Sequence, residues 1–289
     1  KFLRWSPKIC RPATTPSENE AGVECNGVFN QLLAGVGRLL EPHGIAVGVL
    51  RFDRDRDLPA RPDGAILLQR ELHALGLRTA RENLADLCDP GSFSEYGALA
   101  VAAQSQRRSM DDLVRNTPAD GMVCGTATVG GAPCVVMAYD ATVLAGTQGM
   151  RNHQKTDRML GLALQNKLPV VLFAEGGGGR PGDVDMPILA GLHVATFASF
   201  ARLNGQVPVV GIAAGRCFAG NAALLGCCDV IIATEGSNIG MGGPAMVEGG
   251  GLGVFKPEQI GPAGVQHGNG VIDVLVKDEA QAVAVAKQY

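Results

Sequence analysis

The chain has 289 residues, and its 25 Lys and Arg against 28 Asp and Glu give a formal net charge of −3. Hydrophobic residues make up 46% of the chain, which excludes an intrinsically disordered protein because such chains lack the apolar content for a core. The balanced charge and the 4% aromatic content argue against a nucleic-acid-binding protein, which needs a basic surface and stacking platforms. Apolar runs stay well short of the roughly 18 residues that cross a bilayer, so we expect no membrane span.

The first 76 residues differ in character from the rest, and we interpret 1–76 as an N-terminal extension or linker. Residues 11–22 are rich in Pro, Ser, Thr and Glu, and residues 51–64 alternate charges of both signs, as solvated loops do. Between them, 28–40 predicts one short apolar helix. The chain starts at Lys1 without Met and shows no signal peptide, which is typical of a fragment trimmed from a longer protein.

From residue 77 onward, strands and helices alternate, and this pattern predicts an α/β domain over 77–289. Two β-rich runs, 121–129 and 134–139, are separated by Gly130-Gly131, which predicts a hairpin. The short, wholly apolar run at 169–174 predicts a strand that is buried on both faces, and further strands are predicted at 207–213, 230–233 and 271–276. Amphipathic or small-residue segments predict helices, at 149–166, 187–204, 218–227 and 279–287.

The eight cysteines include no CxxC pair, so we expect no structural zinc site, which needs paired thiolates at short spacing. Cysteines within apolar stretches are typical of a reducing compartment, and this predicts a cytoplasmic protein. Cys217 lies near a glycine-rich turn, but no histidine is close to it in the sequence. We interpret it as a buried thiol rather than a nucleophile.

Two glycine-rich loops each follow a predicted buried strand. The first, EGGGGRPGD at 175–183, has four consecutive glycines whose N–H groups are unshielded by side chains. It either presents donors to an anionic oxygen or is a flexible turn. In the second, within 211–234, a strand turns at Gly215 and enters a helix near Ala219-Gly220. The free N–H groups and the dipole of that helical turn stabilise an anion, although a tightly packed turn needs the same small residues.

The two loops follow apolar strands that are one helix apart in the sequence. If these strands are parallel neighbours, their loops leave the same edge of the sheet. Two sets of backbone N–H groups then converge on one oxygen, as the oxyanion hole of a thioester enolate requires. Each such donor is typically worth about 3 kcal/mol of the barrier.

The order of strands and glycine loops resembles the crotonase-like fold, a spiral of repeated ββα units. More narrowly, 77–289 resembles the N-terminal, CoA-side half of the carboxyltransferase component of biotin-dependent acyl-CoA carboxylases. The motifs that carry this resemblance are RENLADLCDPGSFSEYG at 81–97, DGMVCGTATVGGAPCVVMAYD at 120–140, GTQGMRNHQKTDRML at 146–160, EGGGGR, GRCFAGNAALLGCCD, GGPAMVEGGGLG at 242–253 and NGVIDVLVKDEAQAVAVAK at 269–287.

The resemblance implies transfer of the carboxyl group of carboxybiotin, carried by a partner domain, to the α-carbon of an acyl-CoA. Carried over by position, the backbone N–H groups of Gly177, Gly178, Ala219 and Gly220 form the oxyanion hole for the thioester enolate. The family needs no side-chain nucleophile, because released biotin acts as the base, and no metal is implied in this domain. The implied partners are biotin carboxyl carrier and biotin carboxylase domains, a second carboxyltransferase half that completes the site, and further copies of the chain in a homo-oligomer.

Four basic side chains are candidates for binding the coenzyme A thioester. Arg151, Lys155 and Arg158 have the spacing of one helix face, which either contacts CoA phosphates or is an ordinary solvated face. Arg180 ends the first glycine loop and steadies either a carboxylate or the loop itself. We expect His153, on the same helix, to be solvated.

Two other functions stay open on the sequence alone. A crotonase-type enoyl-CoA hydratase, isomerase or acyl-CoA decarboxylase needs acidic side chains near the oxyanion helix. That helix carries Ala222 and Ala223 instead, which disfavours this chemistry, and only Glu175 and Glu248 keep it open. The second alternative, from another class of function, is a non-catalytic CoA-binding or assembly subunit.

Overall fold

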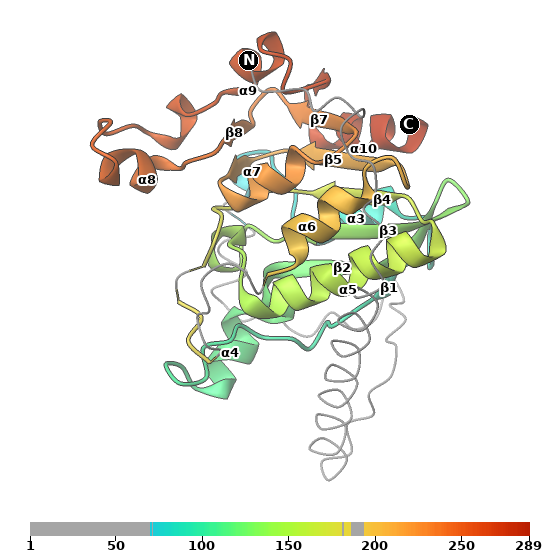
Figure 1. Ribbon diagram of the computed structural model, residues 1–289, viewed down its shortest axis with the longest axis horizontal. Coiled ribbons are helices and arrows are strands. Elements are labelled where there is room, and N and C mark those ends of the chain that lie inside the picture. Colours follow the sequence, from blue (N-terminus) through green and yellow to red (C-terminus); the bar gives the residue numbers. More distant parts are fainter. Residues whose placement is uncertain (1–69, 71, 181, 186–193) are drawn as a thin grey trace, which may run out of the picture. The chain divides into compact units, whose positions relative to one another are not determined.

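The computed structural model describes residues 70, 72–180, 182–185 and 194–289 (Figure 1). These residues all belong to the unit Leu50–Tyr289. The helix predicted at 28–40, the charged segment 51–64 and the first part of the helix predicted at 187–204 lie outside the described residues.

A seven-stranded sheet forms the centre of this unit, in the order β1-β2-β3-β4-β5-β7-β9. The strands β1, β2 and β3 pair antiparallel, and the pairs from β3 to β9 are parallel. This arrangement confirms the predicted α/β class and explains the wholly apolar central strands, because both of their faces are covered. The bounds are β1 Ser94–Glu95, β2 Met122–Val129, β3 Ala132–Tyr139, β4 Val170–Phe173, β5 Val209–Ala213, β7 Val230–Thr234 and β9 Val274–Val276.

The hairpin between β2 and β3 turns at the two glycines that the sequence marks. Gly130 and Gly131 have φ values of 58° and 82°, the positive pair that a tight two-residue hairpin needs. The Asp89 carboxylate accepts hydrogen bonds from both of their N–H groups, at 3.0 and 2.8 Å. The DPGSF motif therefore has a structural role, since its aspartate holds this hairpin in place.

Helices cover both faces of the sheet (Figure 1). Alternate residues of β3 divide between two cores, with Val135 and Met137 in one and Val136 and Ala138 in the other, as the period of a strand requires. One core faces α5, α6 and α7, and the other faces α3 and α10. The bounds are α3 Ala80–Leu87, α5 Met150–Asn166, α6 Thr196–Leu203, α7 Gly220–Leu225 and α10 Glu279–Gln288.

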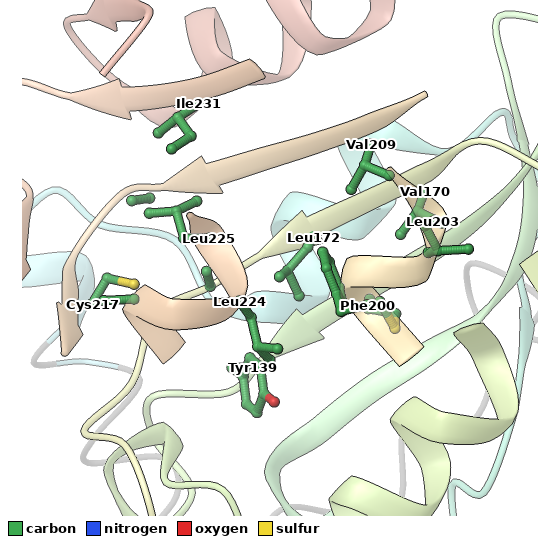
Figure 2. Close-up of a cluster of buried hydrophobic side chains, with 14 of the residues drawn as sticks. Tyr139, Val170, Leu172, Phe200, Leu203, Val209, Cys217, Leu224, Leu225 and Ile231 are labelled. Atoms are coloured by element: carbon green, nitrogen blue, oxygen red, sulfur yellow. The ribbon is translucent and has the colours of Figure 1, made fainter. Parts of the chain in front are cut away.

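Figure 2 shows the core under α6 and α7, where Phe200 and Leu203 of α6 lie beside the side chains of β4 and β5. Both side chains are 0% exposed. Burying a side chain of this size contributes about 1.5–3 kcal/mol relative to leaving it in water. This packing fixes the helices that follow the two glycine loops.

A second, short layer of β structure follows the ends of the central strands. β6 (Arg216–Phe218) pairs in parallel with β8 (Asn238–Gly240), and isolated bridges extend this layer from Gly176 to Cys217 and from Gln148 to Gly179. The chain therefore repeats a central strand, a short second strand and a helix, most plainly in β5–β6–α7. This is the predicted spiral of ββα units.

Several elements differ from the prediction. α7 begins at Gly220 rather than at 218, because residues 216–218 are used in the pairing of β6 with β8. Short elements without a clear periodicity were not predicted: β6, β8, α4 (Met110–Asn116), α8 (Pro244–Gly249) and α9 (Ala263–Gly268). Within the part of the chain that the structure describes, the helices are too short or too polar to cross a membrane.

Candidate functional site

The two glycine loops lie side by side at one edge of the sheet. β4 and β5 are adjacent and parallel, with Phe173 opposite Ile212, so the loops that follow them leave at the same edge. They also touch through backbone hydrogen bonds, from Gly176 N to Arg216 O at 2.7 Å and from Phe218 N to Gly176 O at 2.8 Å. The prediction that both loops leave the same edge of the sheet, side by side, is confirmed.

Their contact is so close that two of the glycines have no room for a side chain. A Cβ atom at Gly178, where φ is +87°, would lie 2.6 Å from Ala219 Cβ and 3.4 Å from Gly220 N. A Cβ atom at Gly220 would lie 2.2 Å from Oε1 of Gln148. The glycines therefore allow the first loop, the start of α7 and Gln148 to approach one another.

Three of the four predicted oxyanion donors are already bonded within the protein. Gly177 N donates to Ala145 O at 3.1 Å, Gly178 N to Asn221 Oδ1 at 3.0 Å, and Ala219 N to Gly240 O at 2.9 Å. These N–H groups are thus unavailable to a ligand in this arrangement. The prediction located the loops, but the structure differs on the donors.

Two neighbouring N–H groups have no acceptor among the described residues. Gly220 is the first residue of α7, where helical N–H groups have no partner within the helix. Gly179 follows Gly178 in the first loop and its backbone is exposed. Gly179 and Gly220 are therefore the N–H groups at this contact that lack an acceptor in the described part of the chain; Gly220 is one of the four predicted positions, and Gly179 is not.

Arg180, which ends the first loop, is held by buried partners. Its guanidinium pairs with the Asp120 carboxylate, lies 3.5 Å from Asp183 Oδ1, and donates to Thr147 O at 2.8 Å. The three charged side chains are at most 4% exposed. Burial raises the pKa of Asp120, and the charge of Arg180 opposes that shift. Of its two predicted roles, Arg180 performs the steadying of the loop.

The predicted basic face of α5 is wrong at its central residue. Arg151 and Arg158 are exposed, but Lys155 is 4% exposed, and its Nζ donates to Ala119 O at 2.8 Å and to Met122 O at 2.5 Å. Burial lowers the pKa of Lys155. Lys155 faces the start of β2 because α5 packs against that segment, a contact that helix periodicity does not reveal.

His153 is also buried, contrary to the expectation of a solvated side chain. Its Nδ1 lies 2.9 Å from Thr196 Oγ1, and that hydroxyl donates to Asp157 Oδ1 at 2.6 Å. Because the Thr196 proton is used on a carboxylate, Nδ1 of His153 is the donor in this pair. Burial lowers the pKa of His153 to about 4, so the ring is neutral at pH 7.

Residues 71–289, which include both glycine loops, match the family model described as the carboxyl transferase domain. The chain belongs to this family. Among curated relatives, it is 32% identical over 217 residues to the methylmalonyl-CoA carboxyltransferase 12S subunit of Propionibacterium freudenreichii subsp. shermanii, covering 75% of this chain and 40% of the relative. It is 30% identical over 213 residues to the biotin-dependent 3-methylcrotonyl-coenzyme A carboxylase beta1 subunit of Mycobacterium tuberculosis, covering 72% and 39%. The chain thus spans about two fifths of the length of these relatives.

Solved structures agree with this assignment. A single-chain, multi-domain long-chain acyl-CoA carboxylase matches with a TM-score of 0.74 and 62% identity, over 78% of this chain and 23% of that one. The transcarboxylase 12S core with methylmalonyl-CoA bound matches with a TM-score of 0.65 and 28% identity, over 76% and 42%. The carboxyl transferase domain described here therefore has the predicted crotonase-like fold.

In this carboxyl transferase domain, the acidic and thiol groups nearest the loops are bonded or buried. Glu175 Oε1 accepts from Ala214 N at 2.6 Å, and burial raises the pKa of Glu175 to about 7. Cys217 is 0% exposed, and burial raises the pKa of its thiol well above the usual range, as the interpretation of a buried thiol requires.

Arg216 is exposed and pairs with Glu258 at 2.6 Å. Among the described residues there is no cluster of three His, Cys, Asp or Glu side chains that suits a metal ion.

Four polar side chains that hold the carboxyl transferase loops were not predicted from the sequence. Gln148 and Asn221 are buried against Gly220 and Gly178, and Asp120 and Asp183 flank Arg180. Asn221 stands in the tripeptide AGN, and Asp120 and Asp183 stand in the dipeptides DG and GD. Such short turn motifs are too common in sequences to identify this role.

Proposed function

We propose that this domain is the CoA-side half of an acyl-CoA carboxyltransferase. Its backbone N–H groups at Gly179 and Gly220 hold the thioester oxygen and stabilise the enolate that forms when the α-carbon loses its proton. Carboxybiotin, delivered by a partner, supplies the carboxyl group and, after release of that group, the base. The new carbon–carbon bond forms between the α-carbon and the transferred carboxyl carbon.

The observation that carries the proposal is the contact between two loops with N–H groups available on each. An oxygen that gains negative charge in the transition state is the ligand such donors suit, and one oxyanion donor is worth roughly 3–4 kcal/mol in mutagenesis. The side chains nearby are not placed for covalent catalysis, since the Cys217 thiol is buried and protonated and the Glu175 carboxyl is bonded to Ala214 N. The domain acts by positioning and charge stabilisation.

We infer that a second carboxyltransferase half covers the segment around α8. α8 has no buried residue, and the apolar side chains near it are exposed by 41–80%: Met241, Met246, Leu252, Val254 and Phe255. Apolar residues gathered in this way mark protein contacts. The transcarboxylase 12S core is described as a hexamer, which supports a homo-oligomer here, together with biotin carboxyl carrier and biotin carboxylase partners.

We also propose an acyl-CoA substrate whose phosphates contact the exposed guanidinium groups of Arg151 and Arg158, with charge-assisted hydrogen bonds. The 62% identity to a long-chain acyl-CoA carboxylase makes a long-chain acyl-CoA the first substrate to test. Four of the six free cysteines in the described part of the chain are buried, which fits the reducing cytoplasm.

The test is carboxyl transfer by the protein together with the second half and a biotinylated carrier. The reverse reaction is convenient: a carboxylated long-chain acyl-CoA, and then malonyl-CoA and methylmalonyl-CoA, are each supplied with free biotin, and decarboxylation is followed by loss of the carboxylated thioester. We expect decarboxylation that depends on biotin. Thioester turnover that is independent of biotin, or binding without turnover when every partner is present, would contradict the proposal.

A further inference from the structure

Asn221 lies beside the proposed donors and joins three segments through one side chain. It is the second residue of α7 and is 0% exposed. Its Oδ1 accepts from Gly178 N at 3.0 Å, and its Nδ2 donates to Gly146 O at 3.3 Å and to Glu175 O at 3.4 Å. The amide therefore links the first glycine loop, the start of α7 and the turn at 144–146.

The turn at 144–146 has a left-handed backbone conformation that depends on contacts with the surrounding residues. Leu144, Ala145 and Gly146 have φ values of 47°, 55° and 63°, and the left-handed region costs a non-glycine residue roughly 1–2 kcal/mol. The carbonyls of this turn point at the glycine loop, since Ala145 O accepts from Gly177 N and Gly146 O accepts from Asn221. Strain of this kind persists where the structure overdetermines the backbone, often at functional sites.

The bond from Gly178 to Asn221 also decides where the next N–H group points. Gly178 O accepts from Gln148 N at 2.7 Å. In a planar trans peptide the C=O and N–H groups point in opposite directions, so the N–H of Gly179 points away from Gln148. Gly178 itself offers no restraint, because it is a glycine with φ of +87°. The orientation of the Gly179 donor thus depends on the two bonds that fix the peptides on either side of Gly178.

We propose that Asn221 is the positioning residue that holds the N–H groups of Gly179 and Gly220 at the spacing one oxyanion needs. It fixes the first donor through Gly178 and is itself part of the helical turn that carries the second. The inference rests on the proposed function for its catalytic consequence. Its structural consequence, an ordered loop at 175–180, is independent of that function.

Asn221→Ala and Asn221→Asp test the proposal in the full chain with its partners. Asn221→Ala removes both the acceptor and the donors, whereas Asn221→Asp keeps the acceptor for Gly178 N and loses the donors to Gly146 and Glu175. Asn166→Ala, at the exposed end of α5, is the matched control. We measure kcat and KM for the acyl-CoA, thermal unfolding, and amide hydrogen exchange of peptides that cover 175–180.

We expect Asn221→Ala to lower kcat about 100-fold, the loss that a misplacement of about 1 Å causes, with KM changed by less than about threefold and with faster exchange across 175–180. Asn221→Asp should retain slower exchange than Asn221→Ala. Unchanged kcat in a folded variant overturns the proposal, whether or not exchange rises. If Asn221→Ala does not fold, Asn221→Leu, which is similar in size and also lacks the acceptor for Gly178 N, takes its place, and wild-type kcat in that variant overturns the proposal. A wild-type protein without biotin-dependent turnover but with the expected exchange pattern rejects the proposed function and supports the positioning.

Discussion

Gly178→Ala is the substitution that most directly tests whether the two loops must touch. The new Cβ would lie 2.6 Å from Ala219 Cβ, whereas carbon atoms pack best at about 3.5–4.0 Å, so the loops must separate by about 1 Å. A misplacement of that size costs about 100-fold in rate. The φ of +87° adds roughly 1–2 kcal/mol of backbone strain in the folded state. We expect kcat to fall about 100-fold and the free energy of unfolding to fall by about 2 kcal/mol.

The assay combines biotin-dependent decarboxylation of malonyl-CoA with urea unfolding. Gly161→Ala is the matched control, because no atom lies within 4 Å of its Cβ position and Gly161 is exposed on α5. That change should leave kcat unaltered and stabilise the helix by up to about 1 kcal/mol. A Gly178→Ala protein with kcat within about threefold of the wild type would refute the reasoning, since close contact of the loops would then be unnecessary.

Three further predictions concern the groups around the loops. Arg180→Met leaves the Asp120 and Asp183 carboxylates buried without their cation, so the free energy of unfolding in urea should fall by roughly 3–5 kcal/mol. A loss below about 1 kcal/mol would contradict a stabilising role for the Arg180 ion pairs. Burial raises the pKa of Glu175 from 4.5 to about 7. Between these pH values the folded protein keeps a proton that the unfolded chain releases, so the free energy of unfolding falls as the pH rises from 4.5 to 7. Glu175→Gln lacks this effect and should gain roughly 3 kcal/mol on the wild type between pH 4.5 and 8, whereas parallel stability curves argue against the shift. Cys217→Ala should keep kcat within about threefold, because the buried thiol is protonated, and a 100-fold loss would point to a nucleophile after all.

The sequence was sufficient for the parts of the fold that periodicity encodes. The hairpin at Gly130-Gly131, the apolar strands β4, β5 and β7, and helix α5 all lie close to the predicted ranges. β6 and β8 have three residues each, too few for any period to show. Their pairing depends on where the spiral brings the chain back, which is a property of the whole fold.

The sequence predicted which loops lie together at the site, but not which of their N–H groups lack an acceptor. Glycines that follow buried strands predicted both loops, and the expectation that parallel neighbours bring their carboxyl ends together placed the loops at one edge. Which N–H groups stay available depends on acceptors from elsewhere in the chain, Ala145 O, Asn221 Oδ1 and Gly240 O. The burial of Lys155 has a similar cause, since its helix position gave no sign of the carbonyls at the start of β2.

Two left-handed turns hold the backbone of the first glycine loop, which supplies one of the two N–H groups of the proposed oxyanion hole. Ala119, Asp120 and Gly121 have positive φ values, as do the three residues of the turn at 144–146. The first turn supplies the Asp120 carboxylate that holds Arg180 at one end of the glycine loop, and the second supplies the carbonyl that holds Gly177 at the other. A loop of glycines has little conformational preference of its own, so its order must come from these supports. Sensitivity to substitution should therefore be greatest at buried residues that never touch the substrate.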